Sequence, residues 1–206
     1  SYIFAIEKND YTFLGASPEQ LIKKDGDRIV STCLAGSIPR GKTADEDQAL
    51  SRALLMDPKN RHEHQLVVQM IKEKLQHLCQ EITLGQEPVI LKTAQIQHLY
   101  TPVQGKIKPF VSLLQLVHTL HPTPALGGYP QKEAVSYIKT HEPFQRGWYA
   151  SPIGWMDLND TGEFIVGIRS GLINGKEAYL YAGCGIVEHS DPLLEYEETN
   201  IKFKPM

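Results

Sequence analysis

The sequence has few of the features that mark several common protein classes. Its 206 residues include only three cysteines, Cys33, Cys79 and Cys184, which are widely spaced and form no Cys-x-x-Cys pair. An odd, scattered set predicts reduced thiols in a cytoplasmic protein rather than a disulfide framework or a zinc site. The apolar runs are short and interrupted by proline, glycine or charge, and no signal-peptide pattern opens the chain. Neither a membrane span nor membrane binding is therefore expected.

The chain also lacks an excess of basic residues. It has 21 lysines and arginines against 24 acidic residues, a net charge of −3, so no nucleic-acid partner is expected. Apolar residues make up 41% and charged residues 22%, which is typical of a globular protein. Residues 1–206 are most simply one domain. There is no initiator methionine, and the first residues already resemble a strand, so we expect a piece of a longer protein that lacks its N-terminal half.

The first third of the chain predicts strands followed by helices. Residues 2–33 have the pattern of short β-strands, with a turn at 25–27. A polar loop is expected over 35–47 and a short helix over 45–56. Asp57 and Pro58 suit the cap and first position of a helix, which is expected to run to about residue 81.

Further elements are expected in the remainder. These are a strand at 89–91, helices over 110–120 and 131–140, and a hairpin over 163–187 that turns at Asn174-Gly175. A two-residue turn there would pair Arg169 with Leu180. Because strands and helices come in separate runs without βαβ alternation, the fold class is predicted to be α+β with a largely antiparallel sheet.

Several short motifs follow one another along the chain. They are Ser17-Pro18-Glu19, Leu34-Ala35-Gly36-Ser37, Arg61-His62-Glu63-His64, Leu120–Gly128, Gly167-Ile168-Arg169-Ser170, Ala182–Val187 and Glu195–Thr199. In this order they resemble the C-terminal part of the chorismate-utilising enzymes, and most closely the isochorismate synthases. The resemblance implies antiparallel β-sheets flanked by helices, as in the sandwich of aminodeoxychorismate (ADC) synthase, here in an N-terminally truncated piece.

Three glutamates are candidate metal ligands. Glu63 shares the apolar face of its helix with Val67 and Met70, where a carboxylate needs a metal ion or a salt bridge. Glu195 and Glu198 would share a helical face, although they also fit a solvated acidic surface. The resemblance implies that the three hold Mg²⁺, which in turn holds the ring carboxylate of chorismate.

The histidines beside Glu63 are a separate matter. His62 and His64 are two residues apart, so on a helix their side chains do not converge on one metal ion. They are expected at the surface or in a supporting role.

Other residues are candidate substrate ligands. A guanidinium at Arg169 on an otherwise apolar strand calls for a carboxylate, which an internal glutamate could also supply. By resemblance that carboxylate is the enolpyruvyl group of chorismate, with Tyr149 adding a hydroxyl and Lys202 close by. Gly183 and Gly185 would let the backbone approach the ligand, or would simply allow tight β packing.

The chemistry implied by the resemblance needs an acid. Glu19 alone would pass for an exposed loop residue, but by resemblance it is the general acid that lets the 4-hydroxyl of chorismate leave as water. His98 matches a histidine near the reacting ring, or is a satisfied core histidine. Ala125 and Leu126 would shape the wall beside the ring. The family's base lysine is expected upstream of residue 1.

The resemblance also limits the reaction. Ala35 offers no amine, so water adding at C2 is the expected nucleophile and isochorismate the expected product. It would feed menaquinone synthesis, which we favour, or siderophore synthesis. The alternatives are a salicylate synthase, which goes on to eliminate pyruvate, and a non-catalytic chorismate- or metal-binding fragment. The full-length protein is expected to be a monomer.

Overall fold

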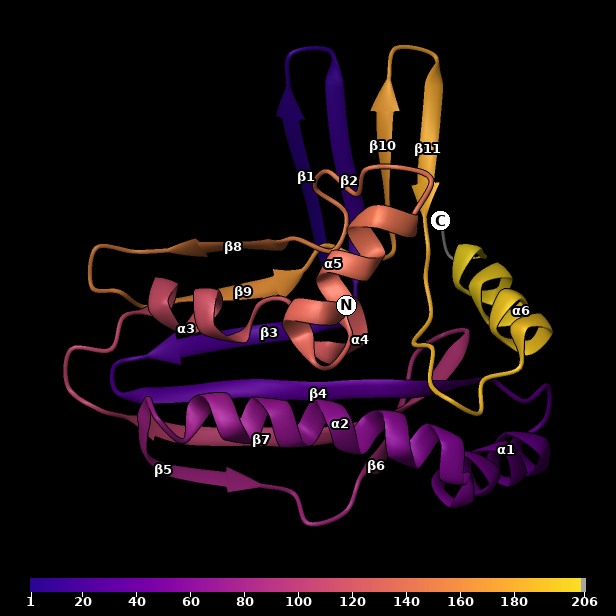
Figure 1. The fold of residues 1–206 in the computed structure, drawn as a ribbon, viewed down its shortest axis with the longest axis horizontal. Helices are drawn as coiled ribbons and strands as arrows, with labels where there is room; N and C mark the ends of the chain where they lie inside the picture. The colour runs from indigo at the N-terminus through magenta and orange to yellow at the C-terminus, as the bar shows by residue number, and fades with distance from the viewer. Residues whose placement is uncertain (205–206) are drawn as a thin grey trace.

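The computed structural model describes residues 1–204, which fold into two antiparallel sheets with helices packed around them (Figure 1). The fold class predicted from the sequence is confirmed. No helix in this part of the chain is both long and apolar enough to cross a bilayer. The helices are α1 (Ala44–Met56), α2 (Pro58–Leu75), α3 (Leu113–Leu120), α4 (Pro124–Gly127), α5 (Gln131–His141) and α6 (Pro192–Phe203).

The larger sheet runs horizontally in Figure 1 in the order β5-β7-β4-β3-β9-β8, with β6 paired to β7. Long β4 and β7 form its centre and pair over eleven positions. The smaller sheet, in the order β1-β2-β10-β11, stands across it. The strands are β1 (Tyr2–Lys8), β2 (Tyr11–Ser17), β3 (Gln20–Asp25), β4 (Arg28–Pro39), β5 (Cys79–Leu84), β6 (Val89–Lys92), β7 (Ile96–Ile107), β8 (Pro152–Met156), β9 (Gly162–Val166), β10 (Ser170–Asn174) and β11 (Glu177–Tyr181).

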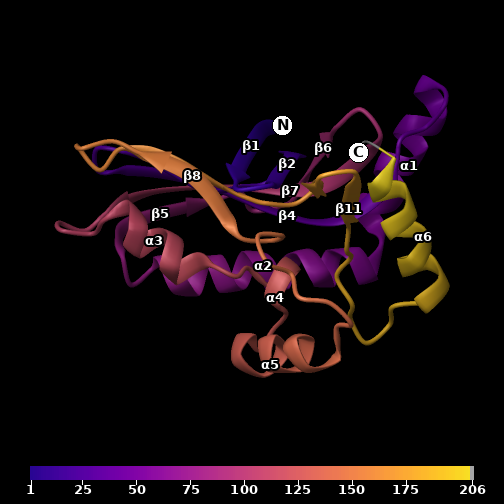
Figure 2. The same ribbon diagram turned by 90° about the horizontal axis from the view of Figure 1, so that it is seen from above.

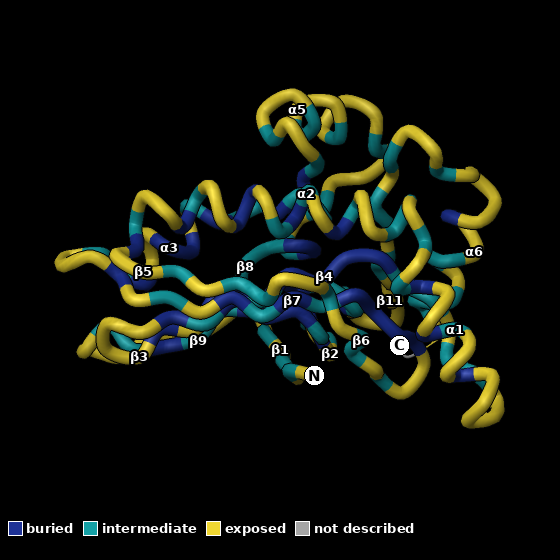
Figure 3. Tube along the Cα trace, turned by 90° about the horizontal axis from the view of Figure 1, so that it is seen from below, coloured by how far each residue is buried: buried dark blue, intermediate teal, exposed yellow. Residues whose placement is uncertain are grey.

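Helices α2 and α3 cover one face of the larger sheet (Figure 2). Asp57 caps α2 by accepting a hydrogen bond from the Asn60 amide at 2.8 Å, and Pro58 occupies the first turn, as predicted. The apolar residues of α2 recur at helical spacing and pack on β4, β5 and β7, so that burial concentrates between helix and sheet (Figure 3). This packing fixes the orientation of α2 on the sheet, and with it the direction in which its other side chains project.

Two predictions about element boundaries were wrong, and one long strand was not predicted. The loop expected from residue 35 is the end of β4, which continues to Pro39 because β7 pairs with it that far. Helix α2 ends at Leu75, and Cys79 already belongs to β5. β7, the partner of β4, β5 and β6, was not predicted. Both of its faces are buried over residues 96–101, and the buried polar residues Gln97, His98 and Thr101 break the alternation of an amphipathic strand.

The hairpin prediction was right in kind and wrong in register. Strands β10 and β11 pair Asn174 with Glu177, so the turn residues are Gly175 and Lys176, and Leu180 faces Gly171. The expected pairing of Arg169 with Leu180 was therefore wrong. Arg169 lies between β9 and β10, which belong to different sheets, and its φ of 51° bends the chain from one sheet to the other.

Candidate active site

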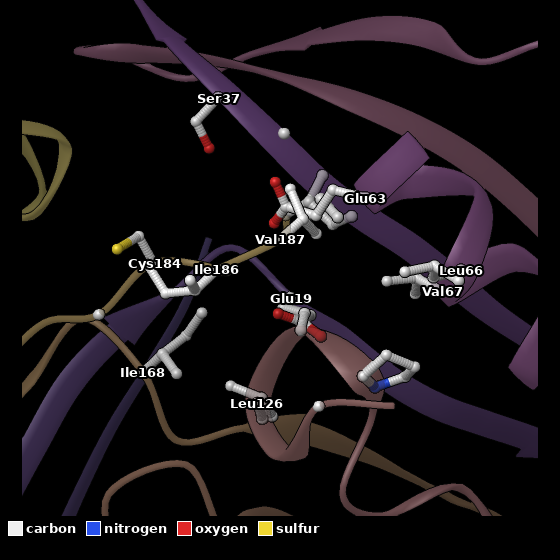
Figure 4. Close-up of a pocket in the computed structure, with 18 of the residues that line it drawn as sticks. Glu19, Ser37, Glu63, Leu66, Val67, Leu126, Ile168, Cys184, Ile186 and Val187 are labelled. Atoms are coloured by element: carbon white, nitrogen blue, oxygen red, sulfur yellow. The ribbon is translucent and has the colours of Figure 1, made fainter. Parts of the chain in front are cut away.

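A cavity of about 810 Å³ opens where the two sheets meet α2, α4 and the segment after β11 (Figure 4). This volume is in the range of small-molecule sites. The structure brings nine predicted site residues to its wall: Glu19, Glu63, His98, Ala125, Leu126, Tyr149, Arg169, Gly183 and Lys202. Glu195 and Glu198 lie on α6, which is helical as the prediction about their spacing required.

Glu19 lies at the junction between β2 and β3, and it is buried rather than exposed. Its amide donates to the Ser17 hydroxyl at 3.2 Å, and its carbonyl accepts from the Val166 amide at 3.1 Å. The backbone is thus held between the sheets, and the carboxyl group points into the cavity (Figure 4). Burial raises the pKa of Glu19 to about 7, although Arg169 and Lys202 act in the opposite direction. A carboxyl group with this pKa can hold a proton near neutral pH and release it.

Arg169 and Tyr149 form the neighbouring wall. Burial lowers the pKa of Arg169, whereas the charges of Glu198, Tyr149 and Glu19 raise it. Within residues 1–204 the guanidinium makes no ion pair, so the internal carboxylate considered for it is not in contact. Tyr149 stacks on Tyr181 with ring centres 5.2 Å apart, which fixes its hydroxyl beside Gly183. A cation and a fixed hydroxyl at one wall suit a ligand carboxylate.

His98 reaches the cavity from β7 and is 3% exposed. Its Nδ1 lies 2.9 Å from the Ser37 hydroxyl oxygen, and its Nε2 has no hydrogen-bond partner in the protein. Burial lowers the pKa of His98 to about 3, and the charges of Arg169 and Lys202 act in the same direction. The imidazole is therefore neutral at physiological pH.

Three glutamates and two lysines lie close together on two helices. Lys59 and Glu63 belong to α2, and Glu195, Glu198 and Lys202 belong to α6. Glu195 lies 2.5 Å from the Lys59 ammonium, and Glu198 lies 2.5 Å from Lys202, whose ammonium also donates to the Gly183 carbonyl at 2.9 Å. Glu63 has no ion-pair partner within residues 1–204. Burial, followed by the charge of Glu198, raises the pKa of Glu63 to about 7.

The donor chemistry of this group can be compared with that of a magnesium site. Glu195 Oε2 is buried without a hydrogen-bond partner, and Glu198 repels Glu63. Carboxylate oxygens that lack partners and repel one another fit a hard divalent cation. However, no group of three or more histidine, cysteine, aspartate or glutamate side chains in the described chain is arranged so that it could hold a metal ion. Magnesium binding by these glutamates stays a prediction.

The two histidines beside Glu63 differ from each other. His64 is buried and its Nε2 lies 2.8 Å from the Thr101 hydroxyl, which ties α2 to β7. His62 is exposed and lines the cavity. His62 thus lies at the surface, and His64 has a supporting role between α2 and β7.

The sequence analysis missed Lys59 and left Ser37 unassigned. For Lys59 a signal was present, since it stands four residues before Glu63 and so shares its helical face. For Ser37 there was none, because its contact with His98 depends on the pairing of β4 with the unrecognised β7. The cation beside Glu195 and the hydroxyl beside His98 both come from tertiary structure.

Comparison with known proteins identifies relatives of this chain. The chain is 54% identical over 206 residues to the isochorismate synthase MenF of Bacillus subtilis, matching 100% of this chain and 44% of that protein. The structure of DhbC from Bacillus anthracis superposes with a TM-score of 0.93 at 38% identity, covering 98% of this chain and 55% of that one. The menaquinone-specific isochorismate synthase MenF of Escherichia coli gives a TM-score of 0.85 at 35% identity, covering 93% and 44%.

These matches confirm the resemblance to isochorismate synthases. They also show that the chain spans about half the length of the relatives it matches. Residues 1–206, the whole chain, match the family described as chorismate binding enzyme. The chain therefore belongs to the chorismate-binding enzyme family.

Proposed function

We propose that this chain forms the acid-bearing part of an isochorismate synthase site, which converts chorismate to isochorismate with Mg²⁺. In this reaction water adds at C2 of the ring, the double bonds shift, and the 4-hydroxyl leaves as water. The observation that carries the proposal is Glu19, a buried carboxyl group with a pKa of about 7 in the same cavity as Arg169 and Glu63.

Glu19 acts as the general acid. Hydroxide is a poor leaving group, so the departing 4-hydroxyl must take a proton as its carbon–oxygen bond breaks. Near neutral pH a large part of Glu19 carries that proton. The cations Arg169 and Lys202, which act on its pKa, keep it from rising further and stabilise the carboxylate left after transfer.

The remaining groups hold and enclose the substrate. Arg169 and the Tyr149 hydroxyl bind the enolpyruvyl carboxylate, and Lys202 lies beside the second carboxylate. A divalent cation held by Glu63, Glu195 and Glu198 would supply positive charge to the ring carboxylate. Ala125 and Leu126 line the apolar side of the cavity, where they exclude water from the ring.

The base that activates the attacking water is expected outside this chain. Lys202 is the only lysine of residues 1–204 at the cavity wall, and it is engaged with Glu198 and the Gly183 carbonyl. The proposal therefore assigns the base to the segment before residue 1, as the family resemblance implies. On the basis of the same resemblance, isochorismate is proposed to feed menaquinone synthesis, which we prefer, or siderophore synthesis.

The experiment uses the full polypeptide that carries this chain, incubated with chorismate and Mg²⁺, with products identified by liquid chromatography and mass spectrometry. Isochorismate that disappears on adding EDTA is the expected result. Salicylate together with pyruvate would show that the protein is a salicylate synthase instead. Binding of chorismate without any product would favour a non-catalytic binding role.

A further inference from the structure

Two arginines line the cavity, and they differ in what they contact. Arg169 makes no ion pair within residues 1–204, so its guanidinium is available to a ligand. Arg146 instead uses each of its three guanidinium nitrogens within the protein. Nε and Nη2 donate to the two carboxylate oxygens of Glu142 at 2.8 and 2.6 Å, and Nη1 donates to the Leu126 carbonyl at 2.6 Å. A guanidinium held in this bidentate geometry is suited to fixing protein segments rather than to binding a ligand.

The contact with Leu126 closes the neck of a surface segment. It joins two residues that are 20 positions apart in the chain. Between them the chain forms α5, which lies on the outer side of α4, away from both sheets (Figure 2). We call residues 127–145 the α5 loop, because its two ends are held together as in a compact surface loop. Arg146 is the residue that holds them.

Helix α5 has little else to stabilise it. None of its residues is buried, and among helices and strands it packs chiefly on α4 (Figure 3). A helix of 11 residues is marginal in water by itself. At the beginning of α5, Gln131 accepts from the Lys74 ammonium and donates to the Pro122 carbonyl, both at 2.9 Å. At its end, Glu142 is held by Arg146. Polar contacts at the two ends therefore determine where α5 lies.

The α5 loop forms the outer wall of the cavity. The lining residues that it contributes include Tyr129, Ala134, Tyr137 and Ile138. Leu126, whose carbonyl Arg146 holds, lines the cavity as well. The guanidinium carbon of Arg146 also lies 6.0 Å from the centre of the Tyr149 ring, within range of a cation–π contact. One side chain thus fixes the α5 loop, Leu126 and Tyr149 relative to one another.

We propose that Arg146 is a positioning residue that fastens the α5 loop over the cavity as a cover, and that the cover opens when its contacts with Glu142 and Leu126 break. The closed position follows from these contacts and needs no ligand. The ligand that the cover encloses, chorismate, rests on the proposed function. In this role Arg146 does not touch the ligand, which is bound by Arg169 and Tyr149.

Hydrogen exchange of the ligand-free full polypeptide, followed by mass spectrometry, measures how often the cover opens. In Arg146→Gln, the amides of α4 and α5 should exchange about tenfold faster, because charge-assisted hydrogen bonds are lost. The amides of β4 and β7 should keep their rates. Arg146→Lys keeps the charge but not the planar fork, so it should restore only part of the protection.

The matched control is Arg61→Gln. Arg61 also donates to a glutamate and to a backbone carbonyl, those of Glu87 and Leu55, but it does so at the exposed surface. Its substitution should leave exchange in α5 unchanged. Glu142→Gln should resemble Arg146→Gln, and the double variant should add little, because both changes break the same pair.

Two results of the exchange experiment would overturn the proposal. Unchanged exchange of α5 in both Arg146→Gln and Glu142→Gln would show that the pair does not hold the cover. Faster exchange in β4 and β7 as well would show that Arg146 supports the whole fold and not a separate cover. Glu142→Gln keeps the test decisive if Arg146→Gln does not fold.

Chorismate tests the connection of the cover with binding. In the unmodified polypeptide it should slow exchange in α5. In Arg146→Gln, KM for chorismate should rise about tenfold with kcat within about twofold, because wall contacts act alike on substrate and transition state. A higher KM with unchanged ligand-free exchange would mean that Arg146 binds chorismate directly, and an unchanged KM with faster exchange would mean that the cover does not enclose the site. Either result overturns the proposal. If the unmodified polypeptide does not bind chorismate, the proposed function fails, and the ligand-free exchange still decides whether Arg146 holds the cover.

Discussion

Glu19 and Glu195 are equally buried, each 4% exposed, yet their pKa values shift in opposite directions. For Glu19 burial dominates and raises the pKa to about 7, because Arg169 and Lys202 act only from a distance. For Glu195 burial also favours the protonated form, but contact with Lys59 together with hydrogen bonds from Ser190 and Cys184 outweighs it, and the pKa is lowered. Burial alone thus does not decide the protonation state; a cation and hydrogen-bond donors in direct contact can reverse its effect.

The same difference separates the two sides of the cavity. The side built at strand ends carries Glu19 and His98, whose ionised forms are suppressed by burial. The side built by α2 and α6 carries Glu195 and Glu198, each in contact with a lysine, and Glu63, whose pKa burial raises as it does for Glu19. One side is suited to donating a proton and the other to holding positive charge. Substitutions that add or remove a charged partner should therefore affect the protonation of the carboxyl groups differently on the two sides.

The largest expected effect is on turnover, from Glu19→Gln. The amide keeps the shape of the side chain but cannot donate an acidic proton, so we expect kcat for chorismate conversion to fall by about 10²- to 10⁴-fold in the full polypeptide. The dissociation constant of chorismate should change little. In the unmodified protein kcat should fall above about pH 7, as Glu19 loses its proton.

A matched control is Glu87→Gln, which neutralises an exposed carboxylate in a surface pair with Arg61. It should leave both constants unchanged. Retention of full kcat in Glu19→Gln would remove Glu19 from the acid role and undo the functional contrast with Glu195.

The second effect is on the pH dependence of the free energy of unfolding, to which the shifted pKa of Glu19 contributes about 3 kcal/mol at most. The unfolded chain releases the Glu19 proton near pH 4.5, whereas the folded chain holds it to about pH 7. Between these values the folded state binds more protons, so this group makes the free energy of unfolding fall as pH rises, with no further change above about pH 7. Urea unfolding at pH 4 to 8 should show a shallower decline in Glu19→Gln.

Glu63, whose folded pKa is also about 7, should keep part of the decline in that variant. A double substitution of Glu19 and Glu63 by glutamine should remove most of it. An unchanged slope in both variants would mean that neither carboxyl group retains its proton in the folded protein.

Much of the fold and of the candidate site could be predicted from the sequence, but not all of it. The cap of α2, the helical spacing of Glu195 and Glu198, and the strands before residue 33 follow from local rules and were predicted correctly. Order along the chain was enough to identify the family, because the motifs reflect the whole site. Local patterns therefore placed most residues on the right element.

What the sequence did not predict depends on contacts between distant segments. Burial of Glu19 results from the meeting of two sheets, and on the chain alone it resembled an exposed loop residue. Arg169 was assigned to a strand because its neighbours are apolar, whereas it lies at the bend between the sheets. β7 is buried on both faces over residues 96–101, and three of these residues, Gln97, His98 and Thr101, are polar, so the alternation on which local rules depend is lost.

A third effect, of about 2 kcal/mol, should follow from Lys59→Met. The substitution leaves the buried Glu195 carboxylate without its cation, although part of the cost is avoided because the Lys59 side chain is 22% exposed. Urea unfolding at pH 7 should show the loss, and adding Glu195→Gln should recover most of it. Arg61→Met breaks an exposed pair and should cost under about 1 kcal/mol. Equal losses in the two single variants would show that the Lys59 pair behaves as a surface pair.

The smallest effect on stability is expected from Gly185→Ala, which acts on the carboxylate side without changing any charge. A Cβ at residue 185 would collide with Glu63 Oε1, so the Glu63 carboxylate must move aside. Because the clash is with the end of a flexible side chain, the fold should lose less than about 1 kcal/mol. Gly85→Ala, whose Cβ would lie 3.4 Å from Pro102, is the matched control.

If Glu63 helps to hold the predicted magnesium ion, calorimetric titration with Mg²⁺ in the presence of chorismate should show an affinity about tenfold weaker in Gly185→Ala than in Gly85→Ala. Glu19 keeps its surroundings in this variant, so its pH dependence should be unchanged. Unaltered Mg²⁺ affinity with normal stability would argue that Glu63 is held in the cavity for its proton, like Glu19, and not for a metal ion. The two sides of the cavity would then be less different than their lysines suggest.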